Sequence, residues 1–159
     1  MFQAVDKVKD KDSTPGHKEF KTLLVEDHVV FRHFIKKSLH KNFPKMLIEE
    51  AADGIEALQK VASFAPDLIF MDIRLQGENG LDLTRKIKSN HPHIKVVILT
   101  VFDLPEYRQA ARQYGVQDFV IKGITPWREV VALVKSISSP SAKIVTPVKS
   151  TSSKKGKPI

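Results

Sequence analysis

Short, mostly apolar runs alternate along the chain with longer stretches whose apolar residues recur at helical spacing. Runs of this length and composition are typical of strands buried on both faces of a parallel sheet. The pattern predicts five strands, at residues 21–26, 46–51, 67–71, 94–99 and 117–121. It predicts five helices between and after them, at residues 28–41, 54–64, 80–89, 104–114 and 125–137.

Five strand–helix units joined by right-handed crossovers predict an α/β fold, a doubly wound five-stranded parallel sheet with five helices on its two faces. No G-x-G-x-x-G motif follows the first predicted strand, and the sequence contains no Walker loop. These absences favour the other common doubly wound order, 2-1-3-4-5, in which the first and third strands are neighbours.

The apolar face of each predicted helix is expected to pack on the sheet. In the helix at 28–41 this stripe consists of Val30, Phe31, Phe34, Ile35 and Leu39. In the helix at 54–64 it consists of Ile55, Leu58 and Val61. Asp103 is expected to cap the helix at 104–114, because a side-chain oxygen just before a helix can accept hydrogen bonds from its first amides.

Polar side chains stand at the carboxyl ends of four of the five predicted strands. Glu26 and Asp27 come at the end of the first strand, and Asp72 at the end of the third. Thr100 and Lys122 come at the ends of the fourth and fifth. The carboxyl ends of the strands in such a sheet share one edge, where ligands bind. We therefore expect three carboxylates, a hydroxyl and an ammonium to meet there.

A cluster of oxygen donors without Cys or His suits Mg²⁺. With Glu26 and Asp27 holding the ion, Asp72 could act as a carboxylate nucleophile toward a phosphoryl group. Lys122 and Thr100 would then contact the phosphoryl oxygens. Each residue also has a plainer interpretation on its own: Asp27 could equally be a helix N-cap. Their joint placement on one edge favours the functional interpretation.

The segments around these residues resemble bacterial response-regulator receiver domains, the CheY-like family. The resemblance is carried by LVEDH at 24–28, LIFMDIRL at 68–75, VILT at 97–100 and FVIKG at 119–123. It spans about residues 20–138, and the separations of the motifs make it specific.

The resemblance implies a phosphoacceptor of a two-component phosphorelay, in which a sensor histidine kinase or a phosphotransfer protein phosphorylates Asp72. It also implies that Mg²⁺ is held by Glu26, Asp27, Asp72 and the backbone carbonyl of Arg74. Lys122, with Thr100, would contact the phosphoryl group. Such a domain is not an enzyme in the usual sense, since it catalyses at most its own slow phosphorylation and autodephosphorylation.

Two further roles follow from the resemblance. Thr100 and Phe119 would form a conformational switch that signals to a downstream protein partner. Arg74 and Phe102, each two residues beyond a site residue, would tune autodephosphorylation by controlling the access of water, and we expect slow hydrolysis.

Finer details resemble receivers that precede a helix-turn-helix DNA-binding domain, the NarL/LuxR type. These details lie at 26–32, 72–75 and 106–111, although Gln76 replaces a proline that is common in the family. No such output domain follows in this sequence, so we expect a receiver that signals by protein contact, with a phosphorylation-dependent homodimer compatible with the resemblance. The alternative is the receiver portion of a DNA-binding regulator whose helix-turn-helix domain is missing.

The length and the net charge of the chain limit these interpretations. The 159 residues suffice for one domain, predicted at 21–138, between a flexible extension at 1–20 and a disordered basic tail at 139–159. The net charge is +8, but five lysines and no acid lie in 141–159, so nucleic-acid binding by this chain alone is expected to be weak at most. The sequence has no Cys and no run long enough to span a membrane, which is compatible with a cytoplasmic location.

Two other kinds of site are disfavoured. The six histidines include no i,i+4 pair, which argues against zinc. A haloacid-dehalogenase-type phosphatase would need an acid two residues after its Asp nucleophile, and Arg74 stands there.

Overall fold

The computed structural model describes residue 16 and residues 18–139, and it confirms the predicted alternation of strands and helices. The strands are β1 (Lys21–Val25), β2 (Leu47–Ala51), β3 (Leu68–Asp72), β4 (Arg74–Leu75), β5 (Glu78–Asn79), β6 (Lys95–Thr100) and β7 (Asp118–Ile121). The helices are α1 (Val29–Asn42), α2 (Gly54–Phe64), α3 (Gly80–Asn90), α4 (Pro105–Gln113) and α5 (Trp127–Ser138). The two ends predicted to be flexible or disordered, 1–20 and 139–159, lie almost wholly outside the described residues, so these predictions stay predictions.

Five parallel strands form the sheet in the order β2-β1-β3-β6-β7. This is the predicted order 2-1-3-4-5, because β4 and β5 belong to a separate two-stranded antiparallel ribbon. The predicted strands and helices included no element at 74–79. A ribbon forms there, with Gly77 in its turn at φ 77°, a left-handed conformation that glycine adopts without strain. β1 and β3 are neighbours, which brings the ends of the first and third predicted strands together.

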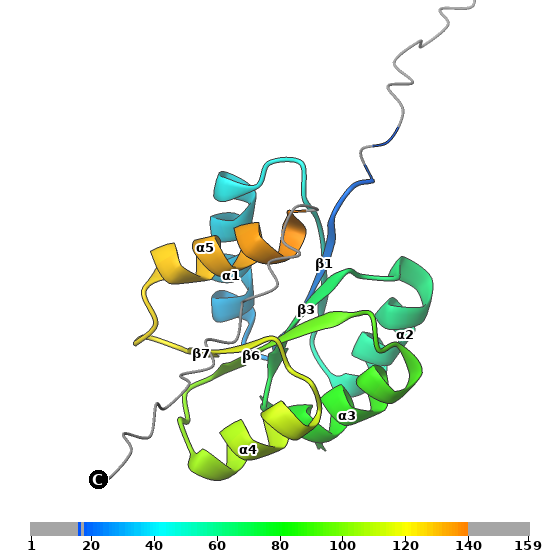
Figure 1. Ribbon diagram of the computed structural model, residues 1–159, viewed down its shortest axis with the longest axis vertical. Coiled ribbons are helices and arrows are strands. Elements are labelled where there is room, and N and C mark those ends of the chain that lie inside the picture. Colours follow the sequence, from blue (N-terminus) through cyan, green and yellow to red (C-terminus); the bar gives the residue numbers. More distant parts are fainter. Residues whose placement is uncertain (1–15, 17, 140–159) are drawn as a thin grey trace, which may run out of the picture.

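Helices cover both faces of the sheet. α1 and α5 lie on one face, and α2, α3 and α4 lie on the other (Figure 1). Alternate residues of the central strands feed the two apolar layers: Leu24 and Phe70 pack on the α1–α5 side, whereas Leu23, Ile69 and Met71 pack on the other. All five are almost completely shielded from solvent. The continuous apolar runs in the sequence follow from this burial on both faces.

The predicted helix faces were partly wrong. In α1, Ile35 and Leu39 are buried, but Val30 and Phe34 are 73% and 53% exposed. Only the residues aligned with the underlying strands reach the sheet, and Phe34 instead packs edge-on against Trp127 of α5 at a centroid distance of 6.1 Å.

A similar correction applies to α2. Val61 is buried as predicted, but Ile55 and Leu58 are 72% and 41% exposed, and Ala57 takes their place against the sheet. A small residue lets the helix approach the strands closely, so the large side chains point away. Hydrophobicity alone therefore gave the wrong rotation of this helix.

The predicted cap of α4 was also wrong. The N-cap residue is Leu104, which makes no side-chain capping hydrogen bond. Asp103 instead forms an ion pair with Arg108, one turn into the helix. The carboxylate thus finds a charged partner in place of the backbone amides of the first turn.

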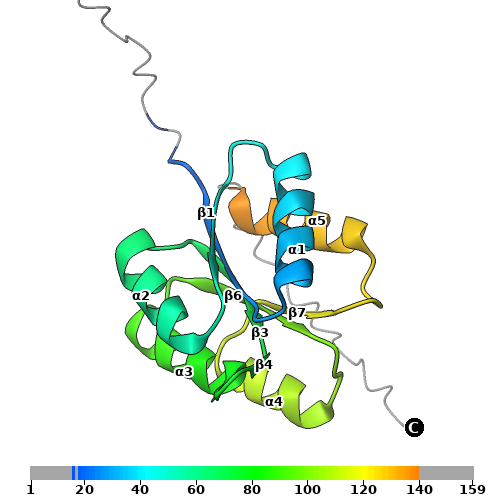
Figure 2. The same cartoon turned by 180° about the vertical axis from the view of Figure 1, so that it is seen from behind.

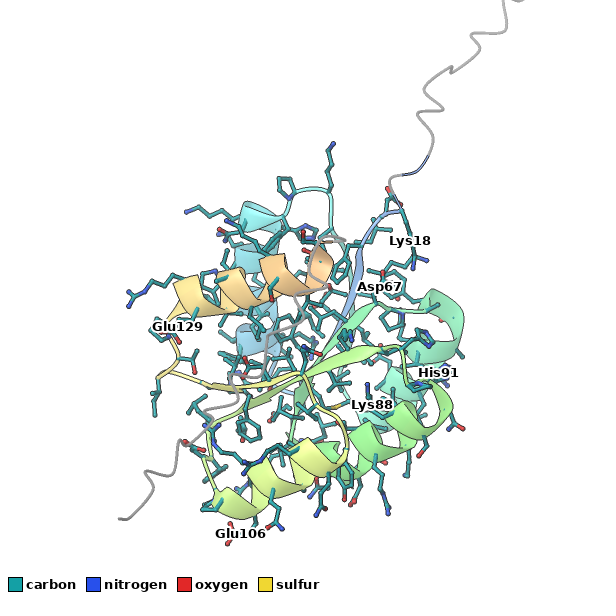
Figure 3. All side chains as sticks on the ribbon, in the orientation of Figure 1. Lys18, Asp67, Lys88, His91, Glu106 and Glu129 are labelled. Carbon is teal, nitrogen blue, oxygen red and sulfur yellow. The ribbon has the colours of Figure 1, made fainter. Side chains whose placement is uncertain are left out.

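The amino edge of the sheet is fastened around Asp67, the residue before β3. Its Oδ1 accepts a hydrogen bond from the Lys18 ammonium at 2.8 Å, and its Oδ2 accepts one from the Lys21 amide at 3.0 Å. Figure 3 shows Lys18 and Asp67 at the end of the sheet where the described chain enters. Within the part of the chain that the structure describes, no helix is both long and apolar enough to cross a membrane.

Candidate functional site

Three acidic side chains meet at the carboxyl edge of the sheet. β1 and β3 pair in parallel with Val25 opposite Met71, so the residues that follow, Glu26 and Asp72, lie side by side. One carboxylate oxygen from each of Glu26, Asp27 and Asp72 lies within 4.8 Å of the others. Glu26 and Asp72 are buried, at 1% and 5% exposure, and Asp27 is partly exposed. The structure therefore brings together the three predicted acids.

Lys122 joins this cluster from the turn after β7. Its ammonium lies 3.1 Å from Asp72 Oδ2 and also donates a hydrogen bond to Glu26 Oε2. The turn is held in place because the Lys122 amide donates to the Thr100 carbonyl at 2.8 Å. The ring of Phe31 lies 4.6 Å from the ammonium, a cation–π contact that the sequence pattern did not reveal.

The cluster carries more negative than positive charge. Among residues 18–139, Lys122 is the one side chain that forms ion pairs with this cluster, and it pairs with Glu26 and Asp72. Burial raises the pKa of Glu26 above its ordinary value of 4.5; the hydrogen bond from Lys122 opposes this rise, and the charge of Asp72 adds to it. Oxygen donors in excess of local positive charge are what a hard divalent cation requires, so these residues fit Mg²⁺.

The alternative role considered for Asp27, a helix N-cap, belongs to His28. The Nδ1 atom of His28 accepts a hydrogen bond from the Phe31 amide at 3.2 Å and so caps α1. The His28 amide in turn donates to Glu26 Oε1 at 3.1 Å. Asp27 is therefore not required for the helix start, which leaves its carboxylate available to the acidic cluster.

The segment after Asp72 approaches it closely. The Arg74 amide donates to Asp72 Oδ1 at 3.2 Å, which places the Arg74 backbone beside the cluster. The chain then turns through β4 and β5, next to the carboxyl end of β3 in Figure 2, and returns at Gly80, whose amide donates to the Ile73 carbonyl at 2.7 Å. A Cβ atom on Gly80 would lie 1.8 Å from the Asp72 carbonyl oxygen, so only glycine fits.

Sequence reasoning missed Gly80 as a residue that positions the site. The available signal was the pair Asn79-Gly80 at the predicted start of a helix, where Asn79 caps α3 by accepting a hydrogen bond from the Leu81 amide at 2.8 Å. That pair predicts a turn, but it does not reveal which backbone the turn will touch.

Thr100, Phe102 and Phe119 lie on the β6–β7 side of the cluster. Thr100 is buried, and its hydroxyl oxygen accepts a hydrogen bond from the Phe102 amide at 3.1 Å. The guanidinium of Arg74 stacks over the Phe102 ring at 3.9 Å from its centroid. Phe119 lies two residues before the end of β7, half-buried, with the guanidinium of Arg108 4.9 Å from its ring centroid. Lys122 contacts Glu26 and Asp72, and the Arg74 amide contacts Asp72, whereas Phe119 lies farther along its strand.

Comparison with known proteins agrees with this geometry. The family described as "Response regulator receiver domain" matches residues 22–135. The oxygen regulatory protein NreC of Staphylococcus aureus is 32% identical over 118 residues, which cover 74% of this chain and 54% of NreC. The chain thus spans about half the length of this curated relative.

Solved structures show the same fold. A two-component response regulator of the LuxR family from Aurantimonas sp. SI85-9A1 is 26% identical, with a TM-score of 0.67 over 79% of this chain and 93% of that one. A CheY-like receiver domain protein from Methanospirillum hungatei JF-1, 22% identical, superimposes with a TM-score of 0.68 over 76% of this chain and 94% of that one. Fold, family match and sequence identity agree, and the chain belongs to the response regulator receiver domain family.

Proposed function

We propose that Asp72 is the phosphoacceptor of this receiver. Receiver domains as a family are phosphoacceptors rather than conventional enzymes, and membership implies a histidine kinase partner and a downstream target in general terms. The position of Asp72 supports the assignment, because its strand β3 pairs with both β1 and β6. Asp72 therefore lies between the Glu26–Asp27 pair and the side of the site formed by Thr100 and Lys122.

Phosphoryl transfer to Asp72 requires little covalent chemistry from the protein. An Asp72 carboxylate oxygen forms a bond to phosphorus while the bond from phosphorus to the leaving atom of the donor breaks. With a phosphohistidine donor, the leaving atom is an imidazole nitrogen, which keeps the bonding electrons. Lys122, already 3.1 Å from Asp72, holds an ammonium beside the incoming phosphoryl oxygens. The chain contributes orientation and fixed positive charge.

Receiver domains generally bind Mg²⁺ at an acidic cluster, and the donor set here fits that ion. We assign it to the side chains of Glu26, Asp27 and Asp72 and to the backbone carbonyl of Arg74. When bound, Mg²⁺ would neutralise negative charge on these acids and on the phosphoryl oxygens. The excess of carboxylates over the Lys122 ammonium supports this assignment.

Thr100 and Phe119 are the proposed switch. Phosphorylation adds a charge of roughly −1.5 to −2. The Thr100 hydroxyl oxygen accepts a hydrogen bond from the Phe102 amide. Its own O–H would be donated to that phosphoryl group as the side chain moves toward the site. Phe119, packed under Arg108, would change its burial in the same transition. A structure with the phosphoryl mimic beryllofluoride tests this: unchanged Thr100 and Phe119 rotamers would exclude the switch.

Arg74 and Phe102 are the proposed regulators of dephosphorylation. Water must attack phosphorus from the side opposite Asp72, and neither side chain can serve as its general base near neutral pH. Their stacking contact, at 3.9 Å, supports a joint effect on water access. Phosphate release should therefore be slow in the wild type and faster in Arg74→Ala with Phe102→Ala; an unchanged rate in the double variant would contradict this role.

The assignment of Asp72 is tested by mass spectrometry after incubation with acetyl phosphate and Mg²⁺. The wild type should gain one phosphoryl group, and Asp72→Asn should gain none. Asp67→Asn is the matched control, since it removes the same charge from the other end of β3 and should be phosphorylated normally. Equal labelling of wild type and Asp72→Asn would refute the assignment.

A second candidate is favoured by one observation, the length of the relatives. This chain spans 54% of NreC, whose name describes an oxygen regulatory protein, and a similar solved structure is a DNA-binding response regulator of the LuxR family from Staphylococcus aureus. The same receiver could therefore be the signal-receiving part of a DNA-binding regulator. The reading frame beyond Ile159 decides between the two: further amphipathic helices with a helix-turn-helix pattern would favour this second candidate.

A further inference from the structure

A polar network lies behind the acidic pair, on α1 and β2. Arg32 extends from the first turn of α1, and its side chain is only 16% exposed. Its Nη1 donates a hydrogen bond of 2.6 Å to the backbone carbonyl of Glu26. Its Nε donates to Glu50 Oε1, on the edge strand β2, at 3.3 Å. One guanidinium therefore connects the end of β1 to the end of β2.

The carbonyl that Arg32 contacts belongs to the peptide that joins Glu26 to Asp27. A peptide unit is planar, so fixing its carbonyl oxygen fixes the plane from which both acidic residues extend. On the other side, the Glu26 amide donates to the Ala51 carbonyl at 3.0 Å. The backbone of Glu26 is thus held from both directions, and Arg32 supplies the only side-chain hydrogen bond to its carbonyl among residues 18–139.

Glu50 orients the guanidinium. Its Oε1 accepts from Arg32, and its Oε2 accepts from the Lys36 ammonium at 2.7 Å. Burial opposes ionisation of Glu50, but the hydrogen bonds and charges of Lys36 and Arg32 outweigh it and lower the pKa of this carboxyl below 4.5. Glu50 therefore stays ionised near neutral pH and keeps Arg32 directed at the peptide. Lys36 also pairs with Glu50, but within the part of the chain that the structure describes it makes no hydrogen bond to Glu26.

We propose that Arg32 is a positioning residue for the Glu26–Asp27 pair: it holds the connecting peptide so that both carboxylates point at one cation. This inference rests on the proposed function, in which these acids hold Mg²⁺. Arg32 touches neither the ion nor the phosphoryl group and acts through the backbone. Partners of this kind fix the direction of the groups that bind a metal directly.

The charge and the geometry of Arg32 have opposite effects on Mg²⁺ binding. A guanidinium near the cluster repels a cation, so its removal should strengthen Mg²⁺ binding if only charge matters. Loss of positioning should weaken binding, because the carboxylates must then be ordered by the ion itself. The sign of the change therefore separates the two effects.

The experiment is a Mg²⁺ titration followed by the backbone amide signals of the full chain in NMR spectra. Arg32→Gln should bind Mg²⁺ roughly tenfold more weakly, in line with the lower end of losses on removing such partners. Lys36→Gln is the matched control: it removes a positive charge and a Glu50 contact but leaves the Glu26 carbonyl bonded. Its affinity should equal or slightly exceed that of the wild type. Unchanged or tighter binding by Arg32→Gln overturns the proposal.

Two further measurements keep the test decisive. Arg32→Lys retains the charge but lacks the planar fork that reaches the carbonyl and Glu50 together, so it should also bind more weakly; wild-type affinity in this variant overturns the proposal even if Arg32→Gln does not fold. Without metal, the Asp27 and His28 amide signals should shift in Arg32→Gln but not in Lys36→Gln. If the wild type itself binds no Mg²⁺ at the cluster, the assignment of the metal site fails, and the metal-free spectra still decide whether Arg32 positions the peptide.

Discussion

Two aspartates at opposite ends of β3 have opposite surroundings. At the amino end, each carboxylate oxygen of Asp67 has its own donor, the Lys18 ammonium and the Lys21 amide. At the carboxyl end, Asp72 shares the Lys122 ammonium with Glu26, and Asp27 adds a third negative charge. The same residue type is fully paired at one end of the strand and under-neutralised at the other.

This difference separates a structural acid, Asp67, from the proposed phosphoacceptor, Asp72. A fully paired carboxylate stabilises the fold and has no remaining need for a ligand. Crowded, buried carboxylates repel one another, and the arrangement becomes favourable only when a cation or another partner supplies the missing positive charge. Residues at functional sites often carry such a cost, which the rest of the fold offsets.

The largest expected effect comes from close packing at the carboxyl edge. Gly80→Ala places a Cβ 1.8 Å from the Asp72 carbonyl oxygen and 2.8 Å from its carbon, and neither backbone atom can move alone. We expect the free energy of unfolding to fall by about 3 kcal/mol, the upper range for overpacking, as measured by denaturant titration.

Gly54→Ala is the control for this prediction. It also begins a helix, but the added Cβ meets Glu78 Oε2, the end of a flexible side chain that can rotate away. It should cost less than about 1 kcal/mol, since alanine also favours the helix. Equal losses for the two variants would show that the close approach at Asp72 is not special.

The two aspartates should respond to neutralisation with opposite signs. Without Mg²⁺, Asp67→Asn should lower the free energy of unfolding by about 1 kcal/mol, because an ion pair and a backbone contact are weakened. Asp72→Asn should raise it by about 1 kcal/mol, because repulsion with Glu26 and Asp27 is relieved. Thermal unfolding tests both variants.

Addition of Mg²⁺ should increase the difference between the Asp67→Asn and Asp72→Asn variants. The ion should raise the melting temperature of the wild type and of Asp67→Asn, by mass action on the folded state. Mg²⁺ should raise the melting temperature of Asp72→Asn much less, because this variant lacks one of the three proposed carboxylate ligands. If Asp72→Asn destabilises the apo protein as much as Asp67→Asn does, the carboxyl edge is not under-neutralised.

A smaller effect is expected at the turn that leads to Asp67. Ala65, the residue after α2, takes φ 51° and ψ 66°, the left-handed conformation that disfavours any residue with a Cβ. Ala65→Gly should therefore stabilise the protein, by about 0.5–1 kcal/mol. Ala62→Gly, an exposed position inside the same helix, should destabilise it by a similar amount. A loss of stability in both variants would contradict the strain at Ala65.

The smallest effect concerns Glu50 and pH. Its pKa in the folded protein lies below the ordinary 4.5, so its contribution to stability is present above that pH and is lost as the pH falls through the folded-state value. Glu50→Gln should be less stable than the wild type by up to about 1 kcal/mol at neutral pH. The difference should shrink below pH 4.5, as followed by urea unfolding at several pH values. A constant difference down to strongly acidic pH would contradict the ionised state of Glu50.

Much of the fold and of the site could be predicted because the relevant signals are local. Apolar runs of strand length alternate with helical periodicity, and this pattern specifies a parallel sheet. Polar residues at strand ends, such as Asp27, Asp72 and Lys122, necessarily share its carboxyl edge. The order of the strands follows from general topological rules and not from any single residue.

What the sequence by itself determined is therefore the architecture and the residue types that gather on one edge. Only the tertiary structure decided how they pair: that Lys122 bonds both Glu26 and Asp72, that Arg74 stacks on Phe102, and that α2 turns Ile55 outward. These features depend on side-chain rotamers and on distances between elements far apart in the sequence. Periodicity encodes the direction of a side chain from its own backbone, but it does not encode which neighbour that side chain will meet.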